Sequence, residues 1–137
     1  MDKSTYQFEQ LLVQLVAQSN KSLAERGRVM PAGLVLGENG AVELTWGKPG
    51  STAIDMPGVV RGIQTMLRGR VAGGTALATC IAFPHDERTV IAMLENNEND
   101  CATISIPVLD GSPPMLDKDN MLIDDGRIHV FPVIAEH

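Results

Sequence analysis

Three neighbouring residues, His85, Asp86 and Glu87, carry the imidazole and carboxylate groups that acid–base chemistry and metal binding require. They fall in a predicted turn, where adjacent side chains point apart, so a metal site there needs another ligand such as His129. One interpretation of the sequence is therefore a small-ligand or metal-dependent enzyme that uses His85, Asp86 and His129. The other interpretation is an ordinary polar turn, because such residues are common where two strands are joined.

A second group of carboxylates suggests a calcium site. Its members are Asp117, Asp119, Asp124 and Asp125. The EF-hand register requires an oxygen ligand at its fifth position, glycine at its sixth and glutamate at its twelfth. Counted from the first aspartate, these positions hold Met121, Leu122 and Ile128. We therefore predict no metal and no cofactor, and we interpret the four aspartates as a solvated acidic surface available to a protein partner.

The two cysteines do not have the surroundings of a catalytic nucleophile. Cys101 follows Asp100 and lies among acidic residues, which disfavour the thiolate. Cys80 falls inside a predicted strand, where a free cysteine is expected to pack as a small apolar residue. Because the sequence also lacks a phosphate-binding loop and a Gly-x-Ser-x-Gly elbow, no catalytic constellation is visible.

The charge balance argues against a protein that binds nucleic acid or an anionic membrane. The 137 residues include 11 Lys and Arg against 17 Asp and Glu, which gives a formal net charge of −6. The charge is divided unevenly, because residues 1–74 have 8 basic and 6 acidic residues whereas residues 75–137 have 3 and 11. No apolar run approaches the roughly 20 residues of a membrane span, and no signal peptide is evident. We expect a cytoplasmic protein with reduced cysteines.

Two segments of opposite charge are candidate contact surfaces. The segment 57–74 contains Arg61, Arg68 and Arg70 and no acidic residue. The segment 95–125 contains 8 of the 17 acidic residues against a single basic residue, Lys118, so the two segments could meet across an interface between two copies of the chain. The single tryptophan, Trp46, is a further candidate for an interaction surface. Its side chain lies either in the core or at an interface, where a tryptophan serves as an anchor.

The spacing of apolar residues predicts two helices. Residues 5–25 carry apolar side chains at the three- and four-residue spacing of an amphipathic helix, and Gly27 is a suitable end. A second helix begins near Pro57, which suits the first helical position. Arg70 falls on the apolar face of this helix, so either the helix ends by Gly69 or Arg70 is partly buried beside a partner.

The rest of the chain predicts strands joined by turns. Asn39-Gly40 is a strong turn pair and predicts a hairpin of residues 34–36 with residues 41–46. After the second helix the alternation of side chains indicates strands, interrupted by one long acidic loop rich in proline and glycine. The predicted strands are 75–83, 88–95, 101–109 and 127–135, and the loop is 110–126.

These elements predict one domain over residues 1–137 with an α+β fold in two layers. Its predominantly antiparallel sheet has about five to six strands, with both amphipathic helices on one face, in the order α-β-β-α-β-β-β-β. The sequence favours a non-enzymatic binding or interaction domain that forms a homodimer. The alternatives are the enzyme that uses His85, Asp86 and His129, and an acidic chaperone or inhibitor of a basic protein partner.

Overall fold

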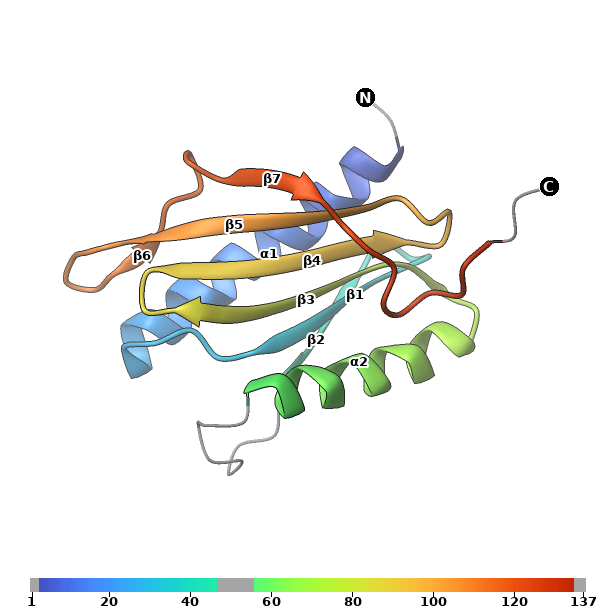
Figure 1. Cartoon of the computed structure of the whole chain (residues 1–137), viewed down its shortest axis with the longest axis horizontal. Helices are drawn as coiled ribbons and strands as arrows, with labels where there is room; N and C mark the ends of the chain where they lie inside the picture. Colours follow the sequence, from blue (N-terminus) through green and yellow to red (C-terminus); the bar gives the residue numbers. More distant parts are fainter. Residues whose placement is uncertain (1–2, 47–55, 135–137) are drawn as a thin grey trace.

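The computed structural model describes residues 3–46 and 56–134, and these residues form two helices and one antiparallel sheet (Figure 1). The strands lie in the order β2-β1-β3-β4-β5-β6, and β7 also pairs with β5. The α+β class predicted from the sequence is confirmed, and so is the predicted order of elements as far as β5. The elements are α1 (Lys3–Arg26), β1 (Ala32–Gly37), β2 (Val42–Trp46), α2 (Met56–Ala72), β3 (Ala76–Asp86), β4 (Thr89–Asn96), β5 (Cys101–Leu109), β6 (Met115–Leu116) and β7 (Leu122–Asp125).

Helix α1 covers one face of the sheet. Its residues Leu11, Leu15 and Leu23 are buried and share a core with alternate residues of β1, β3, β4 and β5. Ala78 and Ala82 of β3 also lie in this core, as the small side chains along that strand predict. The period of two along each strand places these residues together on the α1 side.

Helix α2 covers the opposite face, which corrects the prediction that both helices lie on one face (Figure 1). Its buried residues Ile63 and Leu67 share a second core with Val35 and Ile81. The physical reason is that β1 and β3 carry buried side chains on both faces, so both faces need a covering layer. Gly33 permits the close contact, since a Cβ atom there would lie 2.7 Å from the Cγ2 atom of Ile63.

The chain after β5 differs from the prediction. The segment 110–126, expected to be a loop, contains β6 and β7, which both pair with β5. The sequence predicts a strand at 127–135, but its described part, residues 127–134, forms no strand. These residues instead follow an irregular path on the α2 side of the sheet, and we call them the C-terminal strap. Pro132 has no N–H to donate to a strand ladder, and a glutamate side chain binds the N–H groups of residues 129–131.

The local predictions hold for the hairpin. β1 and β2 pair in antiparallel fashion, and the Asn39 side-chain oxygen accepts a hydrogen bond from the Ala41 N–H at 3.1 Å.

Helix α2 continues to Ala72, so Arg70 lies within the helix and not beyond its end. Neither helix in the described ranges is long and apolar enough to cross a membrane.

Candidate functional site

The C-terminal strap is held on the sheet by a buried carboxylate. Glu95 lies on β4 and is only 2% exposed. Its Oε2 atom accepts a hydrogen bond from the His129 N–H at 2.9 Å. Its Oε1 atom accepts hydrogen bonds from the N–H groups of Val130 and Phe131, both at 2.7 Å, and these two residues are themselves buried. Because hydrogen bonds to a charged acceptor are stronger than neutral ones, the three together fix the path of the strap.

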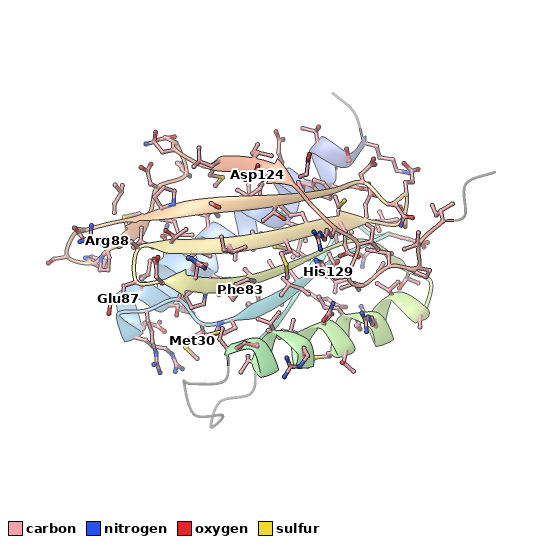
Figure 2. The ribbon with its side chains drawn as sticks, in the orientation of Figure 1. Met30, Phe83, Glu87, Arg88, Asp124 and His129 are labelled. Carbon is pink, nitrogen blue, oxygen red and sulfur yellow. The ribbon has the colours of Figure 1, made fainter. Side chains whose placement is uncertain are left out.

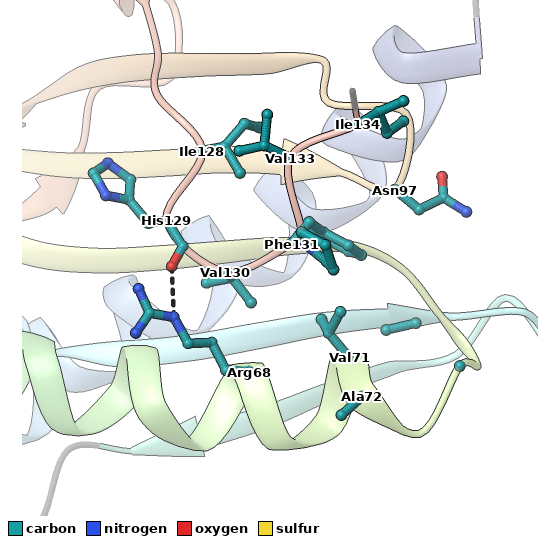
Figure 3. Close-up of a pocket in the computed structure, with 13 residues that line it drawn as sticks. Arg68, Val71, Ala72, Asn97, Ile128, His129, Val130, Phe131, Val133 and Ile134 are labelled. Atoms are coloured by element: carbon teal, nitrogen blue, oxygen red, sulfur yellow. Dashed lines mark hydrogen bonds between the residues drawn. The ribbon is translucent and has the colours of Figure 1, made fainter. Parts of the chain in front are cut away.

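Side chains of α2 and of the β4–β5 turn bind the strap at further points. The carbonyl oxygen of His129 accepts hydrogen bonds from Gln64 Nε2 at 3.1 Å and from Arg68 Nε at 2.9 Å (Figure 3). The Nδ2 atom of Asn99 donates to the carbonyl oxygen of Pro132 at 3.0 Å. The strap is therefore bound through its backbone by side chains from three separate elements.

A groove of about 740 Å³ lies beside the strap and the C-terminal part of α2 (Figure 3). Apolar side chains, among them Val71, Phe131 and Ile134, make much of its wall. Its ionisable groups are those of Arg68 and His129, and its described lining contains no carboxylate and no thiol. The imidazole of His129 points away from the guanidinium in Figure 3. The groove therefore has an apolar wall that a ligand could contact, but its described lining has no acid–base pair for catalysis.

The residues named by the enzyme interpretation lie far apart. His85 and Asp86 are exposed at the end of β3, beside Thr89 at the start of β4. His129 binds Glu95 near the other end of β4, about six residues away, which corresponds to roughly 20 Å of strand. Figure 2 shows His129 well away from the β3–β4 turn. The described parts of the chain contain no cluster of three His, Cys, Asp or Glu side chains that could hold a metal ion.

Two of the three arginines predicted as an interaction face have partners within the chain. Arg70 donates from Nε to the Glu43 Oε2 atom of β2 at 3.0 Å, so its acidic partner lies in its own chain. Arg68 binds the strap, whereas Arg61 is exposed on α2. Trp46 ends β2, and its side chain lies outside the part of the chain that the structure describes.

The four aspartates form two pairs with different surroundings. Asp117 and Asp119 lie between β6 and β7, where the carboxylate of Asp117 accepts hydrogen bonds from the Asp119 N–H at 3.3 Å and from Asn120 Nδ2 at 2.8 Å. Asp124 and Asp125 lie on β7 and are exposed. The first pair therefore belongs to a turn, and the second faces solvent from a strand.

Strand β7 exposes apolar side chains at an edge of the sheet. It pairs with β5 on one side and, within the described residues, with no strand on the other. Leu122 is 69% exposed and Ile123 is 73% exposed. Ile123 lies opposite Ile104 on the α1 side, and Leu122 lies opposite Ser105 on the other side, so both faces of the strand are uncovered. Such an edge is a ready site for pairing with another chain.

Both cysteines are protonated thiols near neutral pH, as their surroundings in the sequence predict. Burial raises the pKa of Cys80 to about 12. Burial also raises the pKa of Cys101, and three nearby carboxylates, those of Glu95, Asp100 and Asp125, raise it further. Because the thiolate is the reactive form, neither residue is prepared for nucleophilic chemistry.

The raised pKa of Cys80 predicts a pH-dependent loss of stability. The unfolded thiol ionises near pH 9.0 and the folded one near 12, so its contribution is complete below pH 9 and is lost as the pH rises. We expect the Cys80→Ala substitution to remove about 1.4 kcal/mol of the decrease in unfolding free energy between pH 8 and pH 10. Urea unfolding of both proteins across this range measures the difference, and a difference independent of pH would contradict the prediction.

Sequence reasoning missed the residues that organise the C-terminal part of the chain. Composition presents Glu95 as one acidic residue among many. Its signal in the sequence is its position, because it directly follows the apolar run Val90–Leu94 of β4. The run Met121-Leu122-Ile123 forms a short apolar interruption of the acidic loop. This interruption is the signal for β7, since three apolar residues in a row among aspartates are unusual in a solvated loop.

Comparisons with protein-family models, with curated proteins and with solved structures found no match. The strap, the groove and the edge of β7 are therefore the observations from which a function can be inferred. Of these, the edge of β7 has exposed apolar groups and no strand on its outer side within the described residues. In the strap, by contrast, the N–H groups of residues 129–131 and the carbonyl groups of residues 129 and 132 already have partners.

Proposed function

We propose that the protein is a non-enzymatic interaction domain that binds an extended strand of a partner protein at the free edge of β7. The observation that carries this proposal is the exposure of Leu122 and Ile123 on opposite faces of an edge strand. A partner strand added there would pair with the open backbone groups of β7 and cover one apolar side chain on each face. In this mode of recognition the main-chain hydrogen bonds supply affinity and the side chains supply specificity.

The opposite edge of the sheet is less suited to a partner, which supports the choice of β7. On β2, the residues Val42, Leu44 and Thr45 are partly buried and Glu43 is already bound to Arg70 of α2, whereas β7 exposes two large apolar side chains. The free thiols of Cys80 and Cys101 fit a reducing compartment, and we propose that the protein acts in the cytoplasm.

Selection from a displayed library of random peptides against the immobilised full chain tests this function. We expect the selected peptides to bind the wild type with micromolar dissociation constants. We expect the Ile123→Lys variant to bind them about tenfold more weakly, because lysine on an edge strand opposes pairing. Fluorescence polarisation with the labelled peptides measures both affinities.

A matched control is the Val133→Lys variant, since Val133 is 76% exposed but lies on the strap. Its affinity for the peptides should equal that of the wild type. Peptides that bind all three proteins equally would show that β7 is not the site. A library that yields no binder at all would reject strand binding as the function.

A second candidate function, homodimerisation, is favoured by the outer face of α1. Residues on this face recur at alternating intervals of four and three residues, the spacing of a coiled-coil seam. None of them is charged: Tyr6, Gln10, Val13, Ala17, Asn20 and Ala24. Asn20 already binds within its own chain, because its Oδ1 atom accepts a hydrogen bond from the Leu116 N–H of β6, so the uncovered part of this face is its N-terminal half. Tyr6 is 58% exposed and Val13 is 64% exposed. A face without charges can pack against its own copy without repulsion, so we propose an isologous contact between two α1 helices.

Sedimentation equilibrium tests the dimer. Because one helix face is smaller than the standard interface of roughly 800 Å² per partner, we expect a dimer that forms at tens of micromolar. The Val13→Glu variant should remain monomeric, since it buries a carboxylate in the seam. The neighbouring variant Gln14→Glu places the same charge beside the seam and should still dimerise. A wild type that stays monomeric at about 100 µM would contradict the proposal.

A further inference from the structure

We infer that the strand accepted by β7 is basic at its start and apolar at its end. Read from its N-terminus, it carries two Lys or Arg residues followed by two apolar residues. This inference rests on the proposed function and names the chemistry of the partner. It follows from which side chains face each other when a strand is added to β7 in the antiparallel direction.

Each face of β7 carries one apolar and one acidic side chain. Ile123 lies directly opposite the buried Ile104, so Ile123 and Asp125 share the α1 side of the sheet. Leu122 and Asp124 share the other side. All four of these β7 side chains are exposed. The edge therefore presents the same pair of chemical groups on its two faces, in the same order along the strand.

An antiparallel partner runs from the Asp125 end of β7 toward the Leu122 end. Residues directly opposite each other lie on the same face and interact, with opposite charges stabilising the pair and like charges destabilising it. The first two partner residues face Asp125 and Asp124, where Lys or Arg side chains form cross-strand ion pairs. The next two face Ile123 and Leu122, where apolar side chains are covered from water. The order basic, basic, apolar, apolar thus satisfies both faces at once.

A second copy of β7 does not satisfy this register. Antiparallel self-pairing about the middle of the strand sets Leu122 opposite Asp125 and Ile123 opposite Asp124, so each carboxylate lies beside an apolar side chain. A shift of one residue in one direction sets Asp124 opposite its own copy, which is repulsive. A shift in the other direction pairs Ile123 with its own copy but sets Asp124 opposite Leu122 and Asp125 opposite Met121, so the carboxylates again lie beside apolar side chains. A homodimer formed through α1 would therefore leave β7 available to a different protein.

Within the described residues no ion pair neutralises Asp124 or Asp125, since the ion pairs found there join Lys3 to Glu98 and Arg70 to Glu43. No Lys or Arg lies on β5 or β7. The nearest basic residues along the chain are Lys118, which lies between Asp117 and Asp119, and Arg127, which follows Gly126 where the strap begins. The opposing positive charge therefore has to come from the partner.

Three fluorescein-labelled peptides, titrated against the full chain, test the inference. The first contains Lys-Arg-Val-Leu, the second Lys-Val-Arg-Leu and the third Glu-Glu-Val-Leu, each between Ser and Thr residues. The second has the composition of the first but is mismatched at two of its four positions in either direction of pairing. We expect the first peptide to bind about tenfold more tightly than the second. We expect its affinity to exceed that of the third peptide by a larger factor. The differences should shrink in about 0.5 M NaCl, because exposed charges are screened.

A reciprocal variant, Asp124→Lys combined with Asp125→Lys, should prefer the Glu-Glu-Val-Leu peptide. Both positions are exposed, and circular dichroism checks that the variant folds. Equal binding of the three peptides to the wild type, with weaker binding by Ile123→Lys, would overturn the charge register but leave the β7 site in place. Equal binding by Ile123→Lys and the wild type would overturn both. If none of the three binds while library-selected peptides do, the inference alone is wrong.

Discussion

Replacing Glu95 with alanine is expected to lower the free energy of unfolding by about 4 kcal/mol and to release the C-terminal strap. The substitution removes three hydrogen bonds to a charged acceptor, each contributing about 1.5 kcal/mol or more. If the strap stays in place, the N–H groups of Val130 and Phe131 are buried without partners. If it detaches, both apolar side chains leave the core beside α2 and become exposed to water.

Urea unfolding and amide hydrogen exchange measure the two effects of this substitution. The amides of residues 129–131 should lose their protection, and Glu95→Gln should cost about half as much because it keeps one acceptor oxygen. Glu98→Ala is the matched control, since Glu98 is exposed and forms only a surface ion pair with Lys3. Its cost should stay below about 1 kcal/mol. A Glu95→Ala protein as stable as the control would contradict the role of the carboxylate.

The elements up to β5 could be predicted because their signals are local. The helical spacing of apolar residues in 5–25 and the Asn39-Gly40 turn depend on neighbours a few residues away. The alternation along β5 is equally local, and it gives the bounds of this strand correctly. The placement of α2 is not local, since it depends on which face of β1 and β3 the first helix leaves open. Helix periodicity identifies an apolar face but not the surface that it covers.

The strap could not be predicted because its partners are distant in the sequence. The carboxylate of Glu95 binds N–H groups 34 to 36 residues away, and Arg68 binds a carbonyl 61 residues away. Residues 127–135 carry the alternation of a strand, but the backbone groups at 129–131 hydrogen-bond to side chains instead of a neighbouring strand. The alternation in a sequence shows only how apolar and polar side chains are spaced. The path of this segment depends instead on which groups hydrogen-bond to its backbone.

Two residues of the candidate site are also among those that the sequence singles out. Asp124 and Asp125 lie exposed on β7, and their contact with a protein partner stays a prediction. The neighbouring Leu122 and Ile123 can be identified as binding residues only once β7 is known to be an edge strand. That assignment depends on the pairing of β7 with β5. The pairing of β3 with β4 likewise separates His85 from His129. His85 lies beside the start of β4 and His129 is bound near its end, so the two residues do not form one site.

Replacing Gly126 with alanine is expected to cost about 3 kcal/mol and to weaken the edge of β7. A Cβ atom at this position would lie 2.8 Å from both the Cα and the carbonyl carbon of Ala102 on β5. Because these are backbone atoms between two strand pairings, they cannot rotate away as a side chain would, and the chain has to shift instead. The shift falls where β7 ends and the strap begins, so it disturbs the pairing of β7 and the approach of the strap to Glu95.

Two comparisons separate this effect from the ordinary effect of replacing a glycine. Gly69→Ala lies in α2 with no atom within 4 Å of its Cβ, and it should stabilise the protein by about 0.5–1 kcal/mol. Gly126→Ala should instead lower the stability in urea and reduce binding of the Lys-Arg-Val-Leu peptide. The double variant Gly126→Ala, Glu95→Ala should lose less unfolding free energy than the sum of the two single losses. The reason is that Glu95→Ala already detaches the strap, so Gly126→Ala can no longer weaken its attachment. Full additivity would mean that Gly126 and Glu95 act on separate parts of the fold.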